Sequence, residues 1–187
     1  MNKALIVVDV QIDFCEGGSL GVAGGSAVAE SIAALLAGQH GYARVVATRD
    51  HHIAPGSHFS ANPDYVDSWP PHCVVGTQGQ LLHPALRDFP FDAIFDKGSY
   101  AAAYSGFEGS IGATPEGEKL AQWLGEQGIT AVDVCGLATD FCVQATARDA
   151  ALEGFETAVL SNLTAAVHPD NVASVKGELL DERIAWA

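Results

Sequence analysis

The sequence predicts an α/β fold, in which a mostly parallel central sheet lies between layers of helices. Short apolar, β-branched segments alternate along the chain with longer segments whose apolar residues recur at helical spacing. Strands that alternate with helices usually form parallel sheets, because each crossover places a helix against one face of the sheet. The chain has 187 residues, of which 48% are hydrophobic, so we expect one well-packed domain over residues 1–187.

The strands are predicted from short apolar runs. The first run, residues 4–8, is uninterrupted and ends at Asp9. Such a run is typical of a strand that is buried on both faces of a sheet. Five later segments predict the remaining strands: residues 44–48, 93–96, 131–135, 156–160 and 184–186.

The helices are predicted from apolar faces and from residues that begin or end a helix. Residues 25–37 have an apolar face, and Gly38 follows as a stop signal. Thr114 suits a helix cap and Pro115 suits the first turn, so we expect a second helix that begins there and ends at Gly128. Two further helices are expected: one from a tight turn at residues 136–140 to about Leu152, and one over residues 172–179.

Composition restricts the location and the partners. The run at residues 4–8 stops at Asp9 and is too short for a membrane span or a signal-peptide core, which predicts a cytoplasmic protein. The four cysteines are then expected to be reduced, with Cys135 in the core. The formal net charge of −14 repels phosphate backbones and anionic lipid, so we expect neither nucleic-acid nor membrane partners. A monomer or small homo-oligomer that binds a small molecule fits this composition.

A metal site is predicted in residues 50–73, which hold four of the seven histidines beside a carboxylate. Asp50 and His52 are two residues apart, so on an extended backbone both side chains point the same way. The following turn can bring His58 back towards them, and His72 would be a fourth ligand. Three imidazoles and one carboxylate suit one divalent ion, Zn²⁺, Fe²⁺ or Mn²⁺. A solvated histidine-rich loop is the alternative.

His51 stands between two of the expected ligands. Because successive side chains of an extended segment alternate in direction, His51 should face away from the ion. We therefore expect it at the surface or behind the ligands.

Four polar side chains lie at the carboxyl ends of predicted strands or just beyond them: Asp9, Asp50, Lys97 and Cys142. In an open parallel sheet these ends converge on one crevice. Cys142 would lie in the first turn of a helix, where free N–H groups and the helix dipole lower a thiol pKa. This position predicts a nucleophile, and the neighbouring N–H groups could bind an oxyanion. A buried structural cysteine is the alternative.

Lys97 follows a buried strand, where its charge requires a partner, and Asp9 is the natural one. Asp9 is also placed to take the proton of Cys142 and to return it to a leaving group. The alternative is a buried ion pair without a catalytic role.

The chain resembles the nicotinamidase/pyrazinamidase group of the isochorismatase-like cysteine hydrolase superfamily. The resemblance covers nearly the whole chain and is carried by five segments: DVQIDFCEGGSL, TRDHHIAPGSHFS, SWPPHCVVGTQG, KGSYAAAYSGFEG and GLATDFCVQATARDA. It implies a three-layer α/β/α sandwich. It also implies hydrolysis of nicotinamide to nicotinate and ammonia in NAD salvage, through a cysteine thioester, with pyrazinamide as a further substrate.

The resemblance also implies roles for individual residues. The implied catalytic triad is Asp9, Lys97 and Cys142. The implied metal ligands are Asp50, His52, His58 and His72. The implied oxyanion donors are the backbone N–H groups of Ala138 and Cys142, after a cis peptide bond between Leu137 and Ala138. The implied substrate wall is Phe14, Trp69, Tyr104 and Ala138, whose flat rings suit a pyridine.

Two positions depart from the pattern of the group. Ile12 stands where relatives commonly have Asn, and Phe141 stands beside the nucleophile where some have His. Both changes replace a polar side chain with an apolar one. We therefore expect altered hydrogen bonds around Ile12, and a difference in pocket polarity and substrate preference near Phe141. Neither change touches the implied triad or the implied metal ligands.

Three other interpretations stay open at the level of sequence. A water activated by the ion could be the nucleophile, which would make the protein a metallohydrolase with Cys142 as a bystander. The loop could belong to a non-enzymatic module that stores Zn²⁺ and binds a small ring, and such a module would need neither Asp9 nor Lys97. The chain could also be an amidase of the same superfamily with another small amide as substrate. The four implied metal ligands argue against isochorismate.

Overall fold

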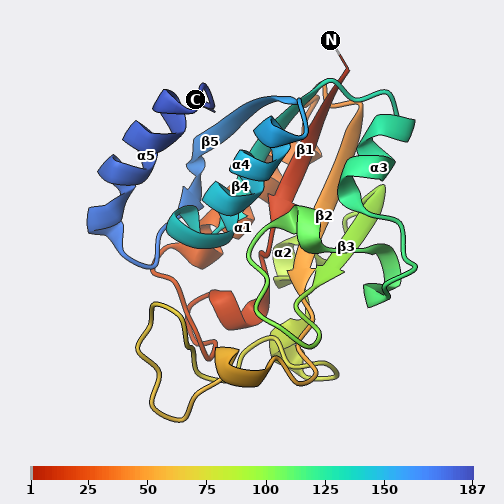
Figure 1. The fold of residues 1–187 in the computed structure, drawn as a ribbon. Coiled ribbons are helices and arrows are strands. Elements are labelled where there is room, and N and C mark those ends of the chain that lie inside the picture. Colours follow the sequence, from red (N-terminus) through yellow and green to blue (C-terminus); the bar gives the residue numbers. More distant parts are fainter. Residues whose placement is uncertain (1) are drawn as a thin grey trace.

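A parallel sheet with helices on both faces organises the computed structural model, which describes residues 2–187 (Figure 1). Within these residues the sheet has six strands in the order β3-β2-β1-β4-β5-β6, and every ladder between them is parallel. The strands are β1 (Lys3–Val8), β2 (Arg44–Asp50), β3 (Ala93–Lys97), β4 (Ala131–Leu137), β5 (Glu156–Ala165) and β6 (Ala185–Trp186). The predicted fold class is confirmed.

Helices separate the strands along the chain and cover the two faces of the sheet. The helices are α1 (Gly25–Ala37), α2 (Pro84–Arg87), α3 (Leu120–Glu126), α4 (Gln144–Leu152) and α5 (Val172–Asp181). In Figure 1, α3, α4 and α5 lie in front of the sheet, and α1 and α2 lie behind it. In the described part of the chain, no helix is long and apolar enough to cross a membrane.

The core has two layers, one on each face of the sheet. Alternate residues of β1 enter opposite layers: Ile6 and Val8 pack with α3, α4 and α5, whereas Leu5 and Val7 pack with α1 and α2. All four side chains are fully buried. Because both faces of the central strands are covered, their sequences read as continuous apolar runs rather than alternating ones.

The strand order reverses direction between β1 and β4. In doubly wound sheets this reversal opens a crevice beyond the carboxyl ends of the strands, since the flanking connections leave towards opposite faces. Asp9 follows β1 directly, and Cys142 lies in the connection after β4. In Figure 1 these strand ends point down towards the long loops, so the topology places both residues beside that crevice.

The helix expected at Thr114 begins later, at Leu120. Thr114 and Pro115 instead open a tight turn, in which the Gly117 N–H donates to the Thr114 carbonyl at 3.0 Å. Pro suits the second position of such a turn as well as it suits a helix start. The pairing of Ser110 with Lys119 brings the ends of this segment together and excludes a helix there.

Several other boundaries differ from those expected. Strand β4 continues to Leu137 and β5 to Ala165, because the two strands pair again beyond an irregularity between Val134 and Gly136. The short helix α2 was not expected. Its signal was Pro84, which occupies the first turn after a cap by His83.

Candidate active site

Cys142 lies in an irregular segment that follows β4. The Leu137–Ala138 peptide bond is cis, and residues Thr139–Val143 then form a single π-helical turn before α4 begins. Cys142 thus lies in the first helical turn after β4, as expected, but that turn is π-helical and precedes the α-helix. The side chain is buried, at 7% exposure, and π-helical turns of this kind recur at functional sites.

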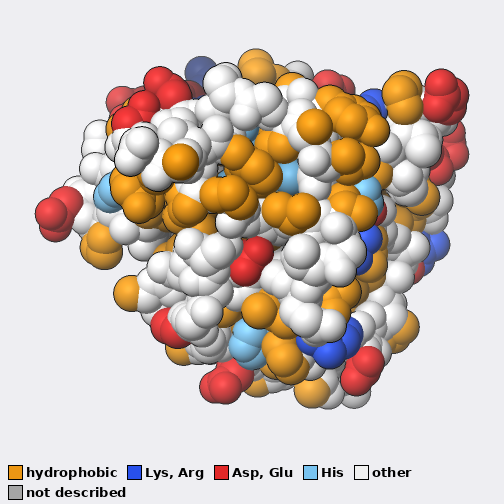
Figure 2. Space-filling model, turned by 90° about the horizontal axis from the view of Figure 1, so that it is seen from below, with side chains coloured by type: hydrophobic (Ala, Val, Ile, Leu, Met, Phe, Trp, Pro, Cys, Tyr) orange, Lys and Arg blue, Asp and Glu red, His pale blue; other side chains and the backbone are white. Residues whose placement is uncertain are grey.

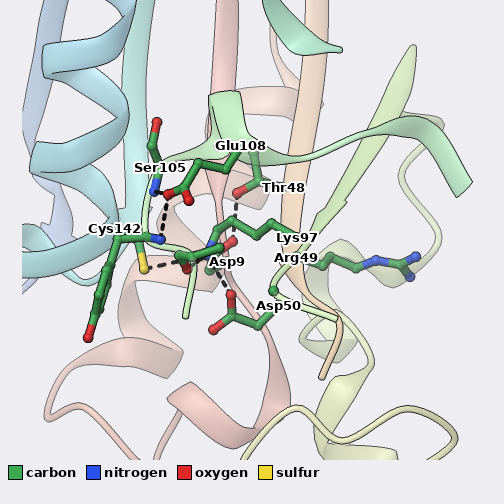
Figure 3. A network of polar contacts seen from close by, with 12 residues as sticks. Asp9, Thr48, Arg49, Asp50, Lys97, Ser105, Glu108 and Cys142 are labelled. Carbon is green, nitrogen blue, oxygen red and sulfur yellow. Dashed lines mark hydrogen bonds and ion pairs between the residues drawn. The ribbon is translucent and has the colours of Figure 1, made fainter. Parts of the chain in front are cut away.

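Lys97 joins the polar side chains of three neighbouring segments (Figure 3). Its Nζ lies 2.9 Å from Asp9 Oδ2, 2.5 Å from Asp50 Oδ1 and 3.6 Å from Cys142 Sγ. It also donates to the Ala103 carbonyl at 3.0 Å. Asp9 receives a further hydrogen bond on Oδ1 from the Thr48 hydroxyl at 2.6 Å. The structure thus brings together the four strand-end residues that the sequence placed at one crevice.

Burial and mutual attraction set the charges of this cluster. Burial raises the pKa of the Cys142 thiol well above its usual value, and it also raises the pKa of Asp9. Burial opposes ionisation of Asp50 and Lys97 as well, but their attraction prevails: the pKa of Asp50 is held well below its usual range and that of Lys97 well above. The expected lowering of the Cys142 pKa is wrong, because desolvation outweighs Lys97.

Three histidines converge next to Asp50. One ring nitrogen each of His52, His58 and His72 lies within 4.8 Å of the others, and all three side chains are buried. Asp50 Oδ2 lies 3.4 Å from His52 Nε2 and 3.6 Å from His72 Nε2, while its other oxygen contacts Lys97. The carboxylate therefore bridges the histidine cluster and the lysine.

The donor set of this cluster fits a divalent metal ion. His52 Nε2 and His58 Nδ1 are buried nitrogens without a hydrogen-bond partner among the described residues, which is costly unless a ligand satisfies them. The other ring nitrogens of His52 and His72 contact the carbonyls of Gly98 and Pro70, and such contacts orient ligating imidazoles. Burial lowers the pKa of His58 to about 4, which keeps its imidazole neutral, as metal binding requires.

His51 lies apart from the three clustered histidines, as its position in the sequence predicted. Its Nδ1 contacts Gln80 Nε2 at 2.8 Å and lies 4.0 Å from Asp96 Oδ2. Arg49 binds the same Asp96 carboxylate through two hydrogen bonds of 2.8 and 2.9 Å. These contacts hold His51 on the side of its segment that faces away from the three clustered histidines.

A pocket beside Cys142 contains the expected aromatic wall. Its lining includes all four expected substrate-wall residues, together with the sulfur and part of the metal cluster: Phe14, Trp69, Tyr104, Ala138, Asp50, His58, His72 and Cys142. Aromatic and apolar side chains form most of this lining, which suits a small flat ring. Trp69 Nε1 donates to Tyr104 Oη at 3.1 Å and so holds two sides of the wall together.

Phe141 adds an apolar ring to this wall, at the position where the sequence departs from its relatives. It meets Trp69 edge-on, with ring centroids 4.9 Å apart, and stacks beside Tyr104 at 6.1 Å. Figure 2 views the molecule from the end that carries the loops, where hydrophobic side chains gather with histidines among them.

Two polar residues of the site were missed by sequence reasoning. The buried Gln11 side chain accepts from the Asp50 N–H at 2.8 Å and donates to the Asp50 carbonyl at 2.9 Å. Asp13 accepts from the Cys73 N–H at 2.7 Å and so ties the loop to the segment after β1. Neighbouring Ile12 donates its N–H to the Leu81 carbonyl at 2.9 Å, so its backbone is held without a polar side chain.

Comparisons with known proteins agree with this geometry. Residues 3–181 match the isochorismatase domain family. The chain belongs to the isochorismatase family. Family membership accounts for the fold, but not by itself for the substrate.

Individual relatives and solved structures show which members of the family this chain is similar to. The chain is 52% identical to a nicotinamidase/pyrazinamidase of Mycobacterium tuberculosis over 95% of this chain and 94% of the relative. It is similar to the crystal structure of PnC1 from L. infantum in complex with nicotinate, with a TM-score of 0.86, 36% identity and coverage of 100% and 92%. A pyrazinamidase of Pyrococcus horikoshii in complex with zinc gives a TM-score of 0.82, 35% identity and coverage of 100% and 99%.

Proposed function

We propose that this protein is an amidase that hydrolyses nicotinamide to nicotinate and ammonia, and pyrazinamide in the same way, within one hydrolase domain. The observation that carries the proposal is the buried Asp9–Lys97–Cys142 cluster, which opens on a small aromatic pocket beside three histidines. The 52% identity to a nicotinamidase/pyrazinamidase supports the choice of substrate. A flat pyridine ring fits between aromatic side chains, where stacking and burial hold it.

The first half of the reaction forms a thioester. Asp9 accepts the thiol proton while Cys142 Sγ bonds to the carboxamide carbon, and the carbonyl electrons move to oxygen. The backbone N–H groups of Ala138 and Cys142 are the proposed donors to this oxyanion, and each such donor contributes about 3 to 4 kcal/mol. Asp9 then returns the proton to the nitrogen as the carbon–nitrogen bond breaks, which releases ammonia.

The second half of the reaction regenerates the thiol. Asp9 takes a proton from water as the water oxygen bonds to the thioester carbon, and the carbon–sulfur bond then breaks. The proton passes to the departing sulfur, and nicotinate leaves. Lys97 Nζ lies 2.9 Å from Asp9 Oδ2 and 3.6 Å from Cys142 Sγ, so its positive charge balances the negative charge that moves between these two groups.

Asp50, His52, His58 and His72 are the residues that would hold a divalent ion, with zinc, iron and manganese as candidates. When bound, the ion supplies Lewis acidity, either to the ring nitrogen of the substrate or to a water molecule. Asp50 would hold the ion with one oxygen and Lys97 with the other, which couples the two parts of the site.

The proposal is tested by ammonia release from nicotinamide with purified wild-type protein, assayed beside metal-stripped protein with Zn²⁺, Fe²⁺ or Mn²⁺ added back. We expect turnover by the wild type and its loss on stripping. A wild type that releases no ammonia from nicotinamide or pyrazinamide while Cys142 still reacts rapidly with electrophiles would contradict the substrate assignment. The substrate would then be another small amide.

A further inference from the structure

Thr48 places a hydroxyl group at a position where the core pattern favours an apolar side chain. It lies in β2, directly opposite Val8 of β1, and alternation puts it on the same face as Val46. Val8 and Val46 belong to the layer packed against α3, α4 and α5, and Thr48 is itself fully buried. Burying a hydroxyl in such a place costs free energy unless it makes a hydrogen bond, so this residue requires an explanation.

Thr48 forms two hydrogen bonds with Asp9, and Figure 3 shows the one between their side chains. Its hydroxyl donates to Asp9 Oδ1 at 2.6 Å, and its carbonyl accepts the Asp9 N–H at 3.2 Å. The second contact matters because the Asp9 backbone has a φ of 50°, in the left-handed region that non-glycine residues seldom occupy. Backbone and carboxylate of Asp9 are therefore both held by one residue of the neighbouring strand.

The two carboxylate oxygens of Asp9 therefore have different hydrogen-bond partners. Oδ1 accepts the short hydrogen bond from Thr48, whereas Oδ2 is buried and makes no hydrogen bond of good geometry among the described residues. Lys97 Nζ lies 2.9 Å from Oδ2 as an ion pair, and the same nitrogen lies 3.6 Å from Cys142 Sγ. Oδ2 and Cys142 Sγ therefore share the Lys97 ammonium group, whereas Oδ1 is held by Thr48.

We infer that Thr48 is a positioning residue for the proposed reaction: its hydroxyl fixes the Asp9 carboxylate with Oδ2 towards Lys97, where Oδ2 exchanges a proton with Cys142. The inference rests on the proposed function, since it assigns Asp9 as the group that moves the proton. Loss of the hydroxyl would let the carboxylate turn about its side-chain bonds. Small misplacements of a catalytic group are costly, and about 1 Å can reduce a rate about 10²-fold.

Two substitutions separate this role from packing. Thr48→Ser keeps the hydroxyl but removes the methyl group, which packs against Gly106. Thr48→Val keeps the branched shape but removes the donor. Positioning predicts that Val lowers kcat for ammonia release from nicotinamide about tenfold or more with KM changed less than about twofold, while Ser stays within about threefold of wild type. Packing alone predicts the reverse order, with Val close to wild type and Ser impaired.

Thr157→Val is the matched control. Thr157 is also a buried strand threonine, and its hydroxyl donates only to the nearby Phe155 carbonyl at 2.9 Å. This variant should keep kcat within about twofold of wild type. Circular dichroism, thermal unfolding and metal content should be measured for all three variants, so that losses of folded or loaded protein are removed from kcat.

Two results overturn the inference: a folded Thr48→Val protein with kcat within about twofold of wild type, or a Ser variant as impaired as Val. A second readout separates this failure from failure of the proposed substrate. The rate of Cys142 alkylation by iodoacetamide, followed at that residue by mass spectrometry, should fall in Thr48→Val and stay near wild type in Thr48→Ser. If wild-type protein releases no ammonia from nicotinamide, an unchanged alkylation rate in Thr48→Val overturns the inference by itself.

Discussion

The sheet carries a lysine–aspartate pair at each end, and only one of them lies in the candidate active site. At the carboxyl end, the Lys97 and Asp9 side chains are both 0% exposed. At the amino end, Lys3 Nζ lies 2.9 Å from Asp133 Oδ1, with side chains 38% and 9% exposed. The same two residue types thus occupy very different surroundings on the same sheet.

The two carboxylates also differ in how completely they are satisfied. Asp133 uses both oxygens, since Oδ1 binds Lys3 and Oδ2 accepts from the Tyr42 hydroxyl at 2.7 Å. Among the described residues, Asp9 Oδ2 makes no hydrogen bond of good geometry, and it lies 2.9 Å from Lys97 Nζ, which also contacts the Cys142 thiol. A buried carboxylate oxygen without a well-aligned donor is rare in a structural ion pair, because it costs free energy. The difference teaches that a poorly satisfied carboxylate oxygen, rather than the ion pair itself, marks the end of the sheet that holds the candidate active site.

The largest expected effect is that of Cys142→Ala. Removal of the nucleophile should lower kcat for nicotinamide at least about 10⁴-fold, while the far-ultraviolet circular dichroism stays unchanged. Cys135→Ala is the control, because Cys135 is a fully buried thiol of β4 outside the site, and its activity should stay within about threefold. Substantial turnover by Cys142→Ala or Cys142→Ser would favour a water activated by the ion as the nucleophile.

The two aspartates give the most direct comparison of the ends. Asp9→Asn should lower kcat about 10²- to 10⁴-fold, because the amide cannot accept the thiol proton. Asp133→Asn should leave kcat within about twofold, since no reacting group touches that residue. Ammonia release under saturating nicotinamide measures both. Similar losses of kcat in the two variants would show that Asp9 Oδ2 has no special role.

Removal of the metal tests the role of the histidine cluster at the carboxyl end of the sheet. Dialysis against a chelator should lower turnover about a hundredfold and release about one ion per chain, and added Zn²⁺, Fe²⁺ or Mn²⁺ should restore both. His58→Ala should reduce the bound ion measured by elemental analysis, whereas His83→Ala, outside the cluster, should not. Full activity in protein shown to contain no metal would refute a catalytic role for the ion.

The lysines test the contribution of each pair to stability. Lys97→Met leaves the buried carboxylates of Asp9 and Asp50 without their cation, which should lower the free energy of unfolding by about 3–5 kcal/mol. Lys3→Met should cost less than about 1 kcal/mol, because that pair is partly exposed to solvent. Urea unfolding of the two variants measures the difference. Equal losses would mean that burial does not distinguish the pairs.

The smallest expected effect lies outside both pairs, at the start of α1. Glu16 accepts from the N–H groups of Gly24 and Ser26, and hydrogen bonds from Ser26 lower its pKa from 4.5 to about 2. A lowered pKa stabilises the folded state above about pH 4.5, and this contribution is lost as the pH falls towards 2. Glu16→Gln should therefore lower the melting temperature slightly at pH 7 but not at pH 2. An equal change at both pH values would contradict this.

Local sequence patterns predicted most of the strands and the residues at their ends, because these features depend on residues that are near one another in the sequence. Continuous apolar runs predicted the strands, since β1 is buried on both faces, and the parallel-sheet rule placed Asp9, Asp50 and Lys97 at one edge. The helix expected at Thr114 failed because Thr-Pro suits a tight turn equally well. There the pairing of Ser110 with Lys119 and with Asp96 decided the outcome.

The sequence by itself determined the α/β class, the cluster of residues at the strand ends and the histidine-rich loop. These features depend only on the order and the chemical type of the residues. Only the tertiary structure decided the strand order, the π-helical turn at Cys142 and the burial that raises the pKa of its thiol. It alone revealed that Thr48 binds one oxygen of Asp9 and leaves the other to Lys97. Desolvation and hydrogen-bond geometry depend on what the rest of the chain packs around a group, so no local pattern contains them.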